Sequence, residues 1–221
     1  MSAGYGTDTA VRHLRDSDPQ LRRLVDSVGP CTLAAPATTH THTLFDRLAT
    51  SIMSQQLSVA AAATITGRLR DKAAGDDHAS GLLRPDRVAA LTDDELRACG
   101  ISRPKVAALR DLADAVETGR IPALAELATL SDEDVVAALT TVRGIGRWTV
   151  EMLLIFLLGR PDVFPVADVG IRRGFERTLG LEHKATPAEM LEHSARWAPY
   201  RSVASWYLWR AVDQTGQPGV R

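Results

Sequence analysis

The sequence predicts an all-α protein, and three observations support this prediction. Apolar residues recur with helical spacing along most of the chain, as Leu44, Leu48 and Ile52 do at intervals of four. Residues typical of helix caps recur between the apolar stretches. No stretch alternates apolar and polar residues beside the turn residues of a β-hairpin. We therefore expect about nine or ten helices joined by short connections.

Most of the expected helices begin at a capping residue or end at a glycine or proline. Ser58 precedes an alanine-rich helix over 59–69, and Thr92 with Glu95 forms a capping box for a helix that ends near Gly100. The remaining expected helices run from Ser102 to Gly119, from Ser131 to about Thr141, from Trp148 to Leu158, from Val169 to Leu179, from the capping box Thr186-Pro187-Ala188-Glu189 onward, and from Pro199 through Val212.

Composition excludes several classes of protein. With 45% hydrophobic and 24% charged residues the chain is typical of globular domains and not of disordered ones. The longest apolar run, Met152–Leu158, has seven residues, far fewer than the roughly 20 that span a bilayer. The first twenty residues lack the apolar segment of a secretory signal. We expect a protein of the cytoplasm or another intracellular compartment, without a membrane partner.

Two further composition features limit the chemistry. Cys31 and Cys99 are the only cysteines, too few for a disulfide framework or for a four-cysteine zinc or iron–sulfur site. The formal net charge is −1, which excludes a histone-like polycation. Nucleic acid is still a possible partner, because helix N-termini and local arginines can hold phosphates without a basic average.

The most informative stretch is Arg143-Gly144-Ile145-Gly146-Arg147-Trp148-Thr149, which lies between two expected helices. Two glycines at this spacing permit a tight turn with positive φ. Such a turn directs the first backbone N–H groups of the next helix outward, where a phosphate can bind. Taken by themselves, two glycines at this spacing between helices are more often an ordinary glycine-rich connection. A weakly similar turn occurs 44 residues before Gly144-Ile145-Gly146-Arg147, at Gly100-Ile101-Ser102-Arg103.

A single carboxylate is the second notable feature. Asp168 follows Phe164-Pro165-Val166-Ala167 and comes directly before an expected helix. A carboxylate at this place is most often an N-cap that accepts hydrogen bonds from the first N–H groups of its helix. A catalytic role is the alternative, and the position alone does not decide between the two.

Taken together, these segments resemble the helix-hairpin-helix superfamily of DNA glycosylases, in particular its DNA-3-methyladenine glycosylase II branch. Residues 143–149 resemble the hairpin of that family, and Pro165-Val166-Ala167-Asp168 resembles the loop that carries its essential aspartate. The resemblance extends upstream to 52–60 and downstream to 196–204, and it ends near Trp209. It covers most of residues 44–210 in the same order.

The resemblance implies two helical lobes with the active site in the cleft between them and DNA across that cleft. The central lobe would span 43–141, the other lobe would combine 1–42 with 150–221, and the DNA-binding hairpin 142–149 would join them. Because a target base must be flipped out of the duplex, a side chain of the turn Gln55-Gln56-Leu57 is implied to fill the gap. Which of the three does so stays open.

A positively charged substrate explains why one carboxylate could suffice. Alkylated purines such as 3-methyladenine and 7-methylguanine are cationic and therefore good leaving groups. Asp168 would stabilise the oxocarbenium-like sugar and orient a water. A cationic base also predicts electron-rich pocket walls. We expect Trp148 and Met152 there, and Trp209 either there or in the core, whereas Trp206 and Tyr207 are expected in the core.

The resemblance also distinguishes this chain from relatives that cut the DNA strand. Those bifunctional relatives carry a lysine just after the hairpin, whose amine forms a Schiff base. Trp148 occupies that position, so the sequence predicts base removal without strand cleavage. No cofactor or metal is expected, because His40, His42, His183 and His193 lack partners at zinc spacing. A monovalent cation held by hairpin carbonyls is implied by the family alone.

We therefore expect a monomeric, monofunctional DNA N-glycosylase. It would hydrolyse the glycosidic bond of alkylated purines in double-stranded DNA, which is the first step of base excision repair. The alternative is a non-catalytic helix-hairpin-helix module that only binds duplex DNA. Asp168 favours the enzyme, because a binding module has no use for an aspartate in the matching loop.

Overall fold

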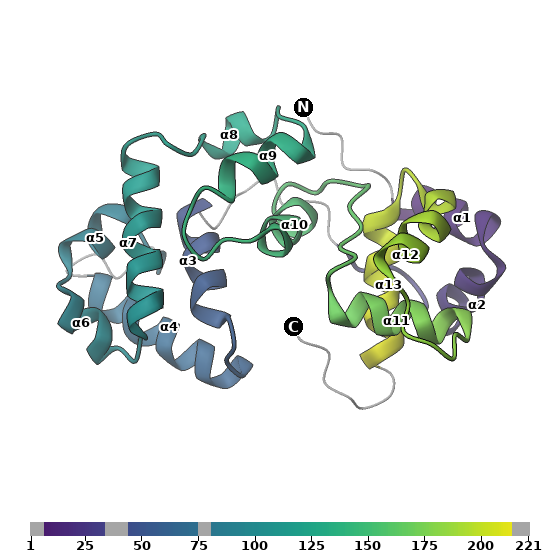
Figure 1. Cartoon of the computed structure of the whole chain (residues 1–221), viewed down its shortest axis with the longest axis horizontal. Coiled ribbons are helices and arrows are strands. Elements are labelled where there is room, and N and C mark those ends of the chain that lie inside the picture. The colour runs from purple at the N-terminus through teal and green to yellow at the C-terminus, as the bar shows by residue number, and fades with distance from the viewer. Residues whose placement is uncertain (1–6, 34–43, 75–80, 214–221) are drawn as a thin grey trace. The chain divides into compact units, whose positions relative to one another are not determined.

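A computed structural model describes residues 7–33, 44–74 and 81–213, and all the regular structure in these ranges is helical (Figure 1). The predicted all-α class is confirmed. The described ranges hold thirteen α-helices and one 3-10 helix, more than the nine or ten expected. The elements missing from the prediction are α1 (Thr7–Ser17), α2 (Pro19–Val28), α5 (Pro85–Ala90), α8 (Leu124–Leu127) and η1 (Ala195–Trp197). Within the described ranges, no helix is long and apolar enough to cross a membrane.

The predicted caps position the other helices. Thr92 and Thr186 each form a capping box, and the Ser131 hydroxyl accepts a hydrogen bond from the Asp134 backbone N–H. The last helix begins two residues later than predicted. The bounds are α3 (Leu44–Ser54), α4 (Val59–Ala74), α6 (Asp93–Ala98), α7 (Arg103–Glu117), α9 (Asp132–Leu139), α10 (Arg147–Phe156), α11 (Val169–Leu179), α12 (Pro187–Ser194) and α13 (Arg201–Asp213).

The chain divides into two compact units, 1–38 with 151–221 and 39–150. We call them the discontinuous unit and the continuous unit. Residues 142–149 lie inside the continuous unit. Helix α10 begins in the continuous unit and ends in the discontinuous one.

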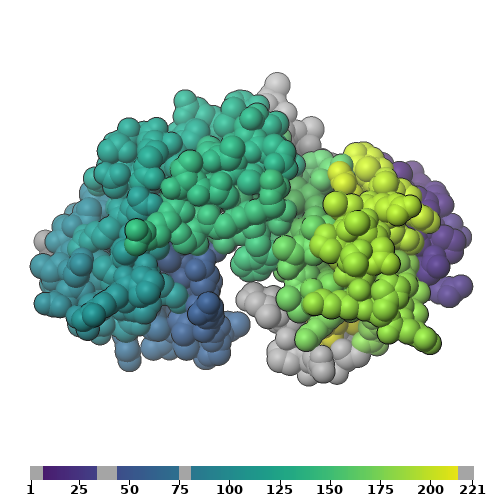
Figure 2. Space-filling view, in the orientation of Figure 1, coloured from purple at the N-terminus to yellow at the C-terminus, as the bar shows by residue number. Residues whose placement is uncertain are grey.

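The discontinuous unit is built around α13. This helix is buried along most of its length and packs against α11, α2 and α1. The N-terminal helices, purple in both views, therefore lie beside the yellow C-terminal helix (Figure 1, Figure 2). Three large aromatic side chains, Trp197, Tyr207 and Phe175, are fully buried in this unit. Trp206 is buried as well, so the expectation that Trp206 and Tyr207 belong to the core is confirmed.

A buried carboxylate, that of Asp18, links the N-terminal helices of this unit to its C-terminal part. Asp18 caps α2 by accepting hydrogen bonds from the backbone N–H groups of Gln20 and Leu21. Its Oδ2 lies 2.9 Å from Trp197 Nε1 and 2.7 Å from His193 Nε2. Burial alone would raise the pKa of Asp18, but these hydrogen bonds and the charge of His193 outweigh it and place the pKa below its usual value.

Replacing Asp18 by asparagine is expected to lower the free energy of unfolding at neutral pH by about 3 kcal/mol, because a buried, hydrogen-bonded charge is lost. The carboxylate stabilises the fold above its unfolded pKa, about 4, and this contribution is lost as the pH falls through the lower folded value. The stability difference between wild type and Asp18→Asn should therefore shrink as the pH falls below about 5 toward the lowered folded pKa. Urea unfolding at each pH measures it, and a constant difference would contradict the assignment.

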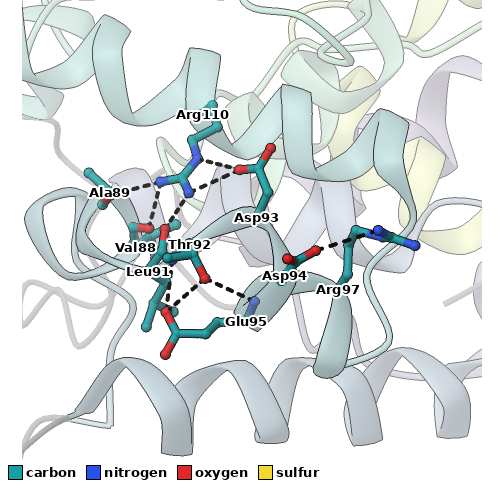
Figure 3. Close-up of polar contacts among 9 residues, drawn as sticks. All are labelled: Val88, Ala89, Leu91, Thr92, Asp93, Asp94, Glu95, Arg97 and Arg110. Carbon is teal, nitrogen blue, oxygen red and sulfur yellow. Dashed lines mark hydrogen bonds and ion pairs between the residues drawn. The ribbon is translucent and has the colours of Figure 1, made fainter.

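Helix α7 organises the continuous unit, where it packs against α3, α5 and α6. Its Arg110 side chain reaches the C-terminal end of α5 and donates hydrogen bonds to the carbonyls of Val88, Ala89 and Leu91 (Figure 3). The same guanidinium lies 3.1 Å from Asp93 Oδ1, at the start of α6. A basic side chain of α7 thus holds one helix end and the beginning of the next, because the last carbonyls of a helix have no partner within it.

Candidate functional site

The hairpin at 142–149 is held at its start by a carboxylate from α7. The backbone N–H of Arg143 donates to Asp111 Oδ2 at 2.6 Å. Arg120 lies 2.6 Å from the other oxygen of Asp111 and also donates to the Thr141 carbonyl. The Arg143 N–H is the main cause that lowers the pKa of Asp111, and Arg120 adds to the effect. Sequence analysis missed this anchor, because the residues lie about thirty positions apart with no local signal.

The two hairpin glycines serve different purposes. Gly144 has φ +80°, and a Cβ there would come within 3.2 Å of the Ala108 Cβ. It therefore meets the predicted need for positive φ. Gly146 has a φ outside the left-handed region, and a Cβ there would meet no atom within 4 Å. The absent side chain at Gly146 instead leaves open space at the first turn of α10.

The other hairpin residues separate into buried and exposed groups. Ile145 and Thr149 are buried, so their side chains cannot reach a DNA surface and only their backbone could do so. Arg147 is exposed but forms a two-point ion pair with Glu133, with N–O distances of 2.9 and 2.6 Å. The Arg143 side chain is exposed and makes no hydrogen bond or ion pair within the described ranges. Arg143 is therefore the basic group most available to a phosphate.

The turn between α3 and α4 contacts the hairpin. Gln55 Nε2 donates to the Gly144 carbonyl at 2.8 Å, so this side chain is directed to the hairpin. Gln56 has φ +58°, the only non-glycine residue of the described ranges with positive φ. This backbone conformation costs roughly 1–2 kcal/mol in an L-residue and often marks a functional position. Leu57 is 40% exposed. Gln56 and Leu57 are thus the better candidates to fill a gap in DNA.

A lysine that the sequence analysis did not single out holds the same turn. Lys105 of α7 donates from Nζ to the carbonyls of Met53 and Gln55, at 2.7 and 2.8 Å. Partial burial lowers the pKa of Lys105. The Met53 carbonyl belongs to the last turn of α3 and the Gln55 carbonyl follows it, where the helix can no longer supply N–H partners.

In the discontinuous unit, the carboxylate of Asp168 is fixed by two donors. Its Oδ1 accepts the backbone N–H of Ile171 at 2.8 Å, which caps α11, and the indole N–H of Trp209 at 3.0 Å. The residue is 9% exposed. The sequence predicts a capping aspartate at this position, and a cap is compatible with a catalytic role. The structure contains the cap, and the cap fixes the carboxylate in orientation.

A glycine and a pair of stacked aromatic rings lie beside the Asp168 carboxylate. A Cβ on Gly170 would lie 3.0 Å from Trp209 Cδ1 and 3.1 Å from Asp168 Oδ1, so only glycine lets the indole approach the carboxylate without displacement. The Phe156 ring stacks on Trp209 with centroids 5.7 Å apart and is 47% exposed. Trp209 therefore lies beside the carboxylate and not in the core. Sequence analysis missed Phe156, although its place one turn after Met152 on α10 could have indicated it.

Exposed apolar side chains concentrate on the elements of the candidate site. The large hydrophobic residues exposed in the described ranges are Leu57, Val59, Trp148, Phe156, Val169 and Leu191. All but Leu191 belong to the α3–α4 turn, to the first turn of α4, to α10 or to the first turn of α11. Trp148, at the start of α10, is 37% exposed, and Met152 is half-buried on the same helix.

No group of three or more metal-ligating side chains is present in the described ranges. His183 lies 3.1 Å from Glu189, and His193 pairs with Asp18. His40 and His42 lie outside the described residues. The monovalent cation at the hairpin stays a prediction. The carbonyl of Gly144, in the hairpin, accepts a hydrogen bond from Gln55.

Comparison with known proteins relates these features to one family. Residues 49–199 match the HhH-GPD superfamily, described as base excision DNA repair proteins. The chain is 36% identical over 198 residues to the DNA-3-methyladenine glycosylase 1 of Schizosaccharomyces pombe, covering 90% of this chain and 84% of that one. It is 32% identical over 211 residues to an alkylbase DNA glycosidase-like protein of the same yeast, covering 95% and 96%.

Two solved structures share the fold over nearly the whole chain. The 3-methyladenine DNA glycosylase of Schizosaccharomyces pombe, in complex with abasic DNA, superposes with a TM-score of 0.77 at 36% identity, covering 91% of this chain and 95% of that one. A DNA-3-methyladenine glycosidase from Bacillus halodurans superposes with a TM-score of 0.81 at 33% identity, covering 94% and 91%.

Proposed function

Because the chain belongs to the HhH-GPD superfamily of base excision DNA repair proteins, we propose that it hydrolyses the N-glycosidic bond of alkylated purines in duplex DNA. The observation that carries this proposal is the fixed, buried carboxylate of Asp168, held by the Ile171 N–H and by the Trp209 indole, on which the exposed Phe156 ring stacks. The relatives that the chain resembles over most of its length are 3-methyladenine DNA glycosylases.

In the proposed reaction, the bond between C1′ of the sugar and the nitrogen of the base breaks, and its electron pair neutralises the positive charge of the alkylated base. A water oxygen bonds to C1′, and one of its protons passes to Asp168 or to solvent. The Asp168 carboxylate stabilises the positive charge that develops on the sugar. No acid is needed for a leaving group that already carries the charge, in contrast to the two carboxyl groups of most glycosidases.

Recognition of the base follows from the aromatic groups. A cationic purine gains up to about 2 kcal/mol from contact with an aromatic face in a site shielded from water. Trp209 and the Phe156 ring stacked on it are suited to this contact from the discontinuous unit. We also propose that Trp148 and Met152, on α10, contribute to recognition of the base. This contact favours charged purines over neutral ones only modestly, so discrimination would also rest on the charge of the leaving group.

Binding to the duplex is proposed to use the hairpin. The first turn of α10 and the open space at Gly146 allow a phosphate to approach the backbone, with Arg143 available beside it. Hairpin carbonyls such as that of Gly144 would hold a monovalent cation, which would supply positive charge for the same phosphate. We propose that the chain acts on DNA as a monomer.

The reaction is proposed to stop at the abasic site. The chain has three lysines, Lys72, Lys105 and Lys184, and none stands just after the hairpin. Lys72 pairs with Glu95 and Lys105 holds backbone carbonyls. Without an amine at the position after the hairpin, no Schiff base is expected. Borohydride is therefore expected to trap no covalent adduct on abasic DNA, with a bifunctional relative as positive control. A trapped adduct would show lyase activity and contradict the proposal.

The Trp209 indole N–H is expected to matter separately from its ring. In Trp209→Phe the stacked aromatic ring is kept, whereas the hydrogen bond to Asp168 Oδ1 is lost. A hydrogen bond to a charged acceptor is worth about 1.5–3 kcal/mol, so single-turnover base release should fall by roughly 10- to 100-fold. Phe156→Leu, which removes a ring but no donor, serves as the matched comparison and should weaken substrate binding more than turnover. An unchanged rate of base release in Trp209→Phe would contradict a role for the indole N–H.

The proposal is tested with a panel of duplexes, each carrying one defined lesion, by identifying the base that is released. Release of 3-methyladenine or 7-methylguanine is the expected result. Binding to every duplex without release of any base would favour the alternative, a non-catalytic module that uses the same hairpin.

A further inference from the structure

The turn between α3 and α4 is held from two sides. On one side, Gln55 Nε2 donates to the Gly144 carbonyl of the hairpin. On the other, Lys105 Nζ donates to the carbonyls of Met53 and Gln55. Between these contacts Gln56 takes its left-handed conformation, and the Leu57 N–H donates back to the Ser54 carbonyl at 3.2 Å. The backbone is thus fixed immediately before the two exposed side chains.

Filling a gap in a base stack requires such fixation. A side chain that replaces a flipped nucleotide must be held rigidly, because any freedom lost on insertion reduces the binding energy. Lys105 is suited to this purpose, since one ammonium group binds two carbonyls of the turn. Both of these hydrogen bonds go to backbone oxygens that precede Gln56 and Leu57, so Lys105 acts on the two side chains through the backbone.

Lys105 follows a turn, residues 100–103, that resembles the hairpin turn at 144–147. Gly100 has φ +96° and Gly144 has φ +80°, and the buried Ile101 and Ile145 follow them. Helix α7 begins at Arg103 as α10 begins at Arg147. Lys105 and Thr149 occupy the same place in the two helices, 44 residues apart, but Thr149 is buried. The two turns are thus alike in backbone, and the earlier one carries a side chain that reaches the carbonyls at the end of α3.

We infer that Lys105 is a positioning residue that holds Gln56 and Leu57 for insertion into the duplex where a nucleotide is flipped or missing. This inference rests on the proposed function for its DNA substrate. It concerns recognition of the gap and not bond cleavage, so it predicts an effect on binding that can be measured without any base release.

The experiment compares the affinity for two duplexes of one sequence, one undamaged and one with a single tetrahydrofuran abasic analogue. Lys105→Met keeps the aliphatic stem and removes the donors, whereas Lys105→Arg keeps both charge and donors. Arg110→Met is the matched control, because Arg110 also lies on α7 and also donates to helix-end carbonyls, but at the end of α5. A 2-aminopurine beside the analogue reports insertion through its fluorescence.

The wild type is expected to prefer the abasic duplex, and Lys105→Met to lose at least about tenfold of that preference through the loss of two charged hydrogen bonds. The affinity of Lys105→Met for the undamaged duplex should stay within about twofold of the wild-type affinity, because contacts with phosphates dominate that binding. Lys105→Arg should restore the preference and the fluorescence change. Arg110→Met should lower thermal stability and leave the preference intact. If Lys105→Met does not fold, Lys105→Gln, with one amide donor group, should lose part of the preference.

Three results would overturn the inference: an unchanged preference in Lys105→Met, an equal loss of affinity for both duplexes, or a wild type without any preference. A wild type that prefers the abasic duplex but releases no alkylated base would refute the proposed hydrolase and still support the inference, provided that Lys105→Met loses the preference.

Discussion

Replacing Asp168 by asparagine is expected to reduce the rate of base release on the order of a thousandfold, while binding of duplex DNA is retained. Asparagine has nearly the same shape, and its side-chain oxygen can still accept the Ile171 and Trp209 N–H groups that now bind Oδ1. What is lost is the full negative charge. Mutations that remove such stabilisation of developing charge reduce rates by about 10²- to 10³-fold, and loss of a general base by up to about 10⁴-fold.

Single-turnover release of 7-methylguanine from a defined duplex measures this effect. Asp94→Asn is the matched control, because it makes the same change of charge at a side chain that is 94% exposed in the continuous unit. It should change the rate by less than about twofold, as a screened surface charge does. Equal rates for wild type and Asp168→Asn would rule out the proposed mechanism, and loss of DNA binding together with release would point to a structural role.

The largest effect on stability is expected at Gly174, in the middle of α11. A Cβ there would lie 2.1 Å from the Leu208 carbonyl oxygen and 2.7 Å from its carbon. These are backbone atoms of α13, so no side chain can move aside. The two helices would have to separate, and both contribute to the site, α11 through its cap Asp168 and α13 through Trp209. Overpacking commonly costs 1–3 kcal/mol, and we expect Gly174→Ala to cost about 3 kcal/mol or more.

Urea unfolding followed by circular dichroism checks this expectation. Gly67→Ala serves as control, because Gly67 lies inside α4 and a Cβ there has no atom within 4 Å. Since alanine is favoured over glycine in a helix interior, this variant should be stabilised by roughly 0.5–1 kcal/mol. A Gly174→Ala protein with an unchanged midpoint would show that α11 and α13 do not pack in such close contact.

The parts of the fold that the sequence predicts are those that depend on neighbouring residues. The capping boxes at Thr92 and Thr186 and the cap at Ser131 involve residues three positions apart, so the sequence alone reveals them. The start of α2 has a signal of the same kind, since Asp18 is its N-cap and Pro19 its first residue. The first two helices were nevertheless missing from the prediction.

The parts of the site that were not predicted depend on contacts between distant residues. Lys105 reaches α3 from 52 positions away, and Asp111 reaches the hairpin from 32. Arg147 is exposed as expected, but its pairing with Glu133 has no sequence signal. Gly146 resembles Gly144 in sequence and differs from it in backbone conformation. Such properties follow from packing of elements and not from local pattern.

The most direct test of the central claim, that a fixed negative charge at Asp168 stabilises positive charge on the sugar, is a comparison of two abasic analogues. One carries a protonated pyrrolidine nitrogen in place of the anomeric carbon, and the other is a neutral tetrahydrofuran. Because transition-state analogues bind about 10²-fold or more tightly than neutral ground-state analogues, the wild type should prefer the cationic duplex by at least about this factor, and Asp168→Asn should lose the preference. Equal affinity of the wild type for both duplexes, or a preference that persists in Asp168→Asn, would contradict the claim.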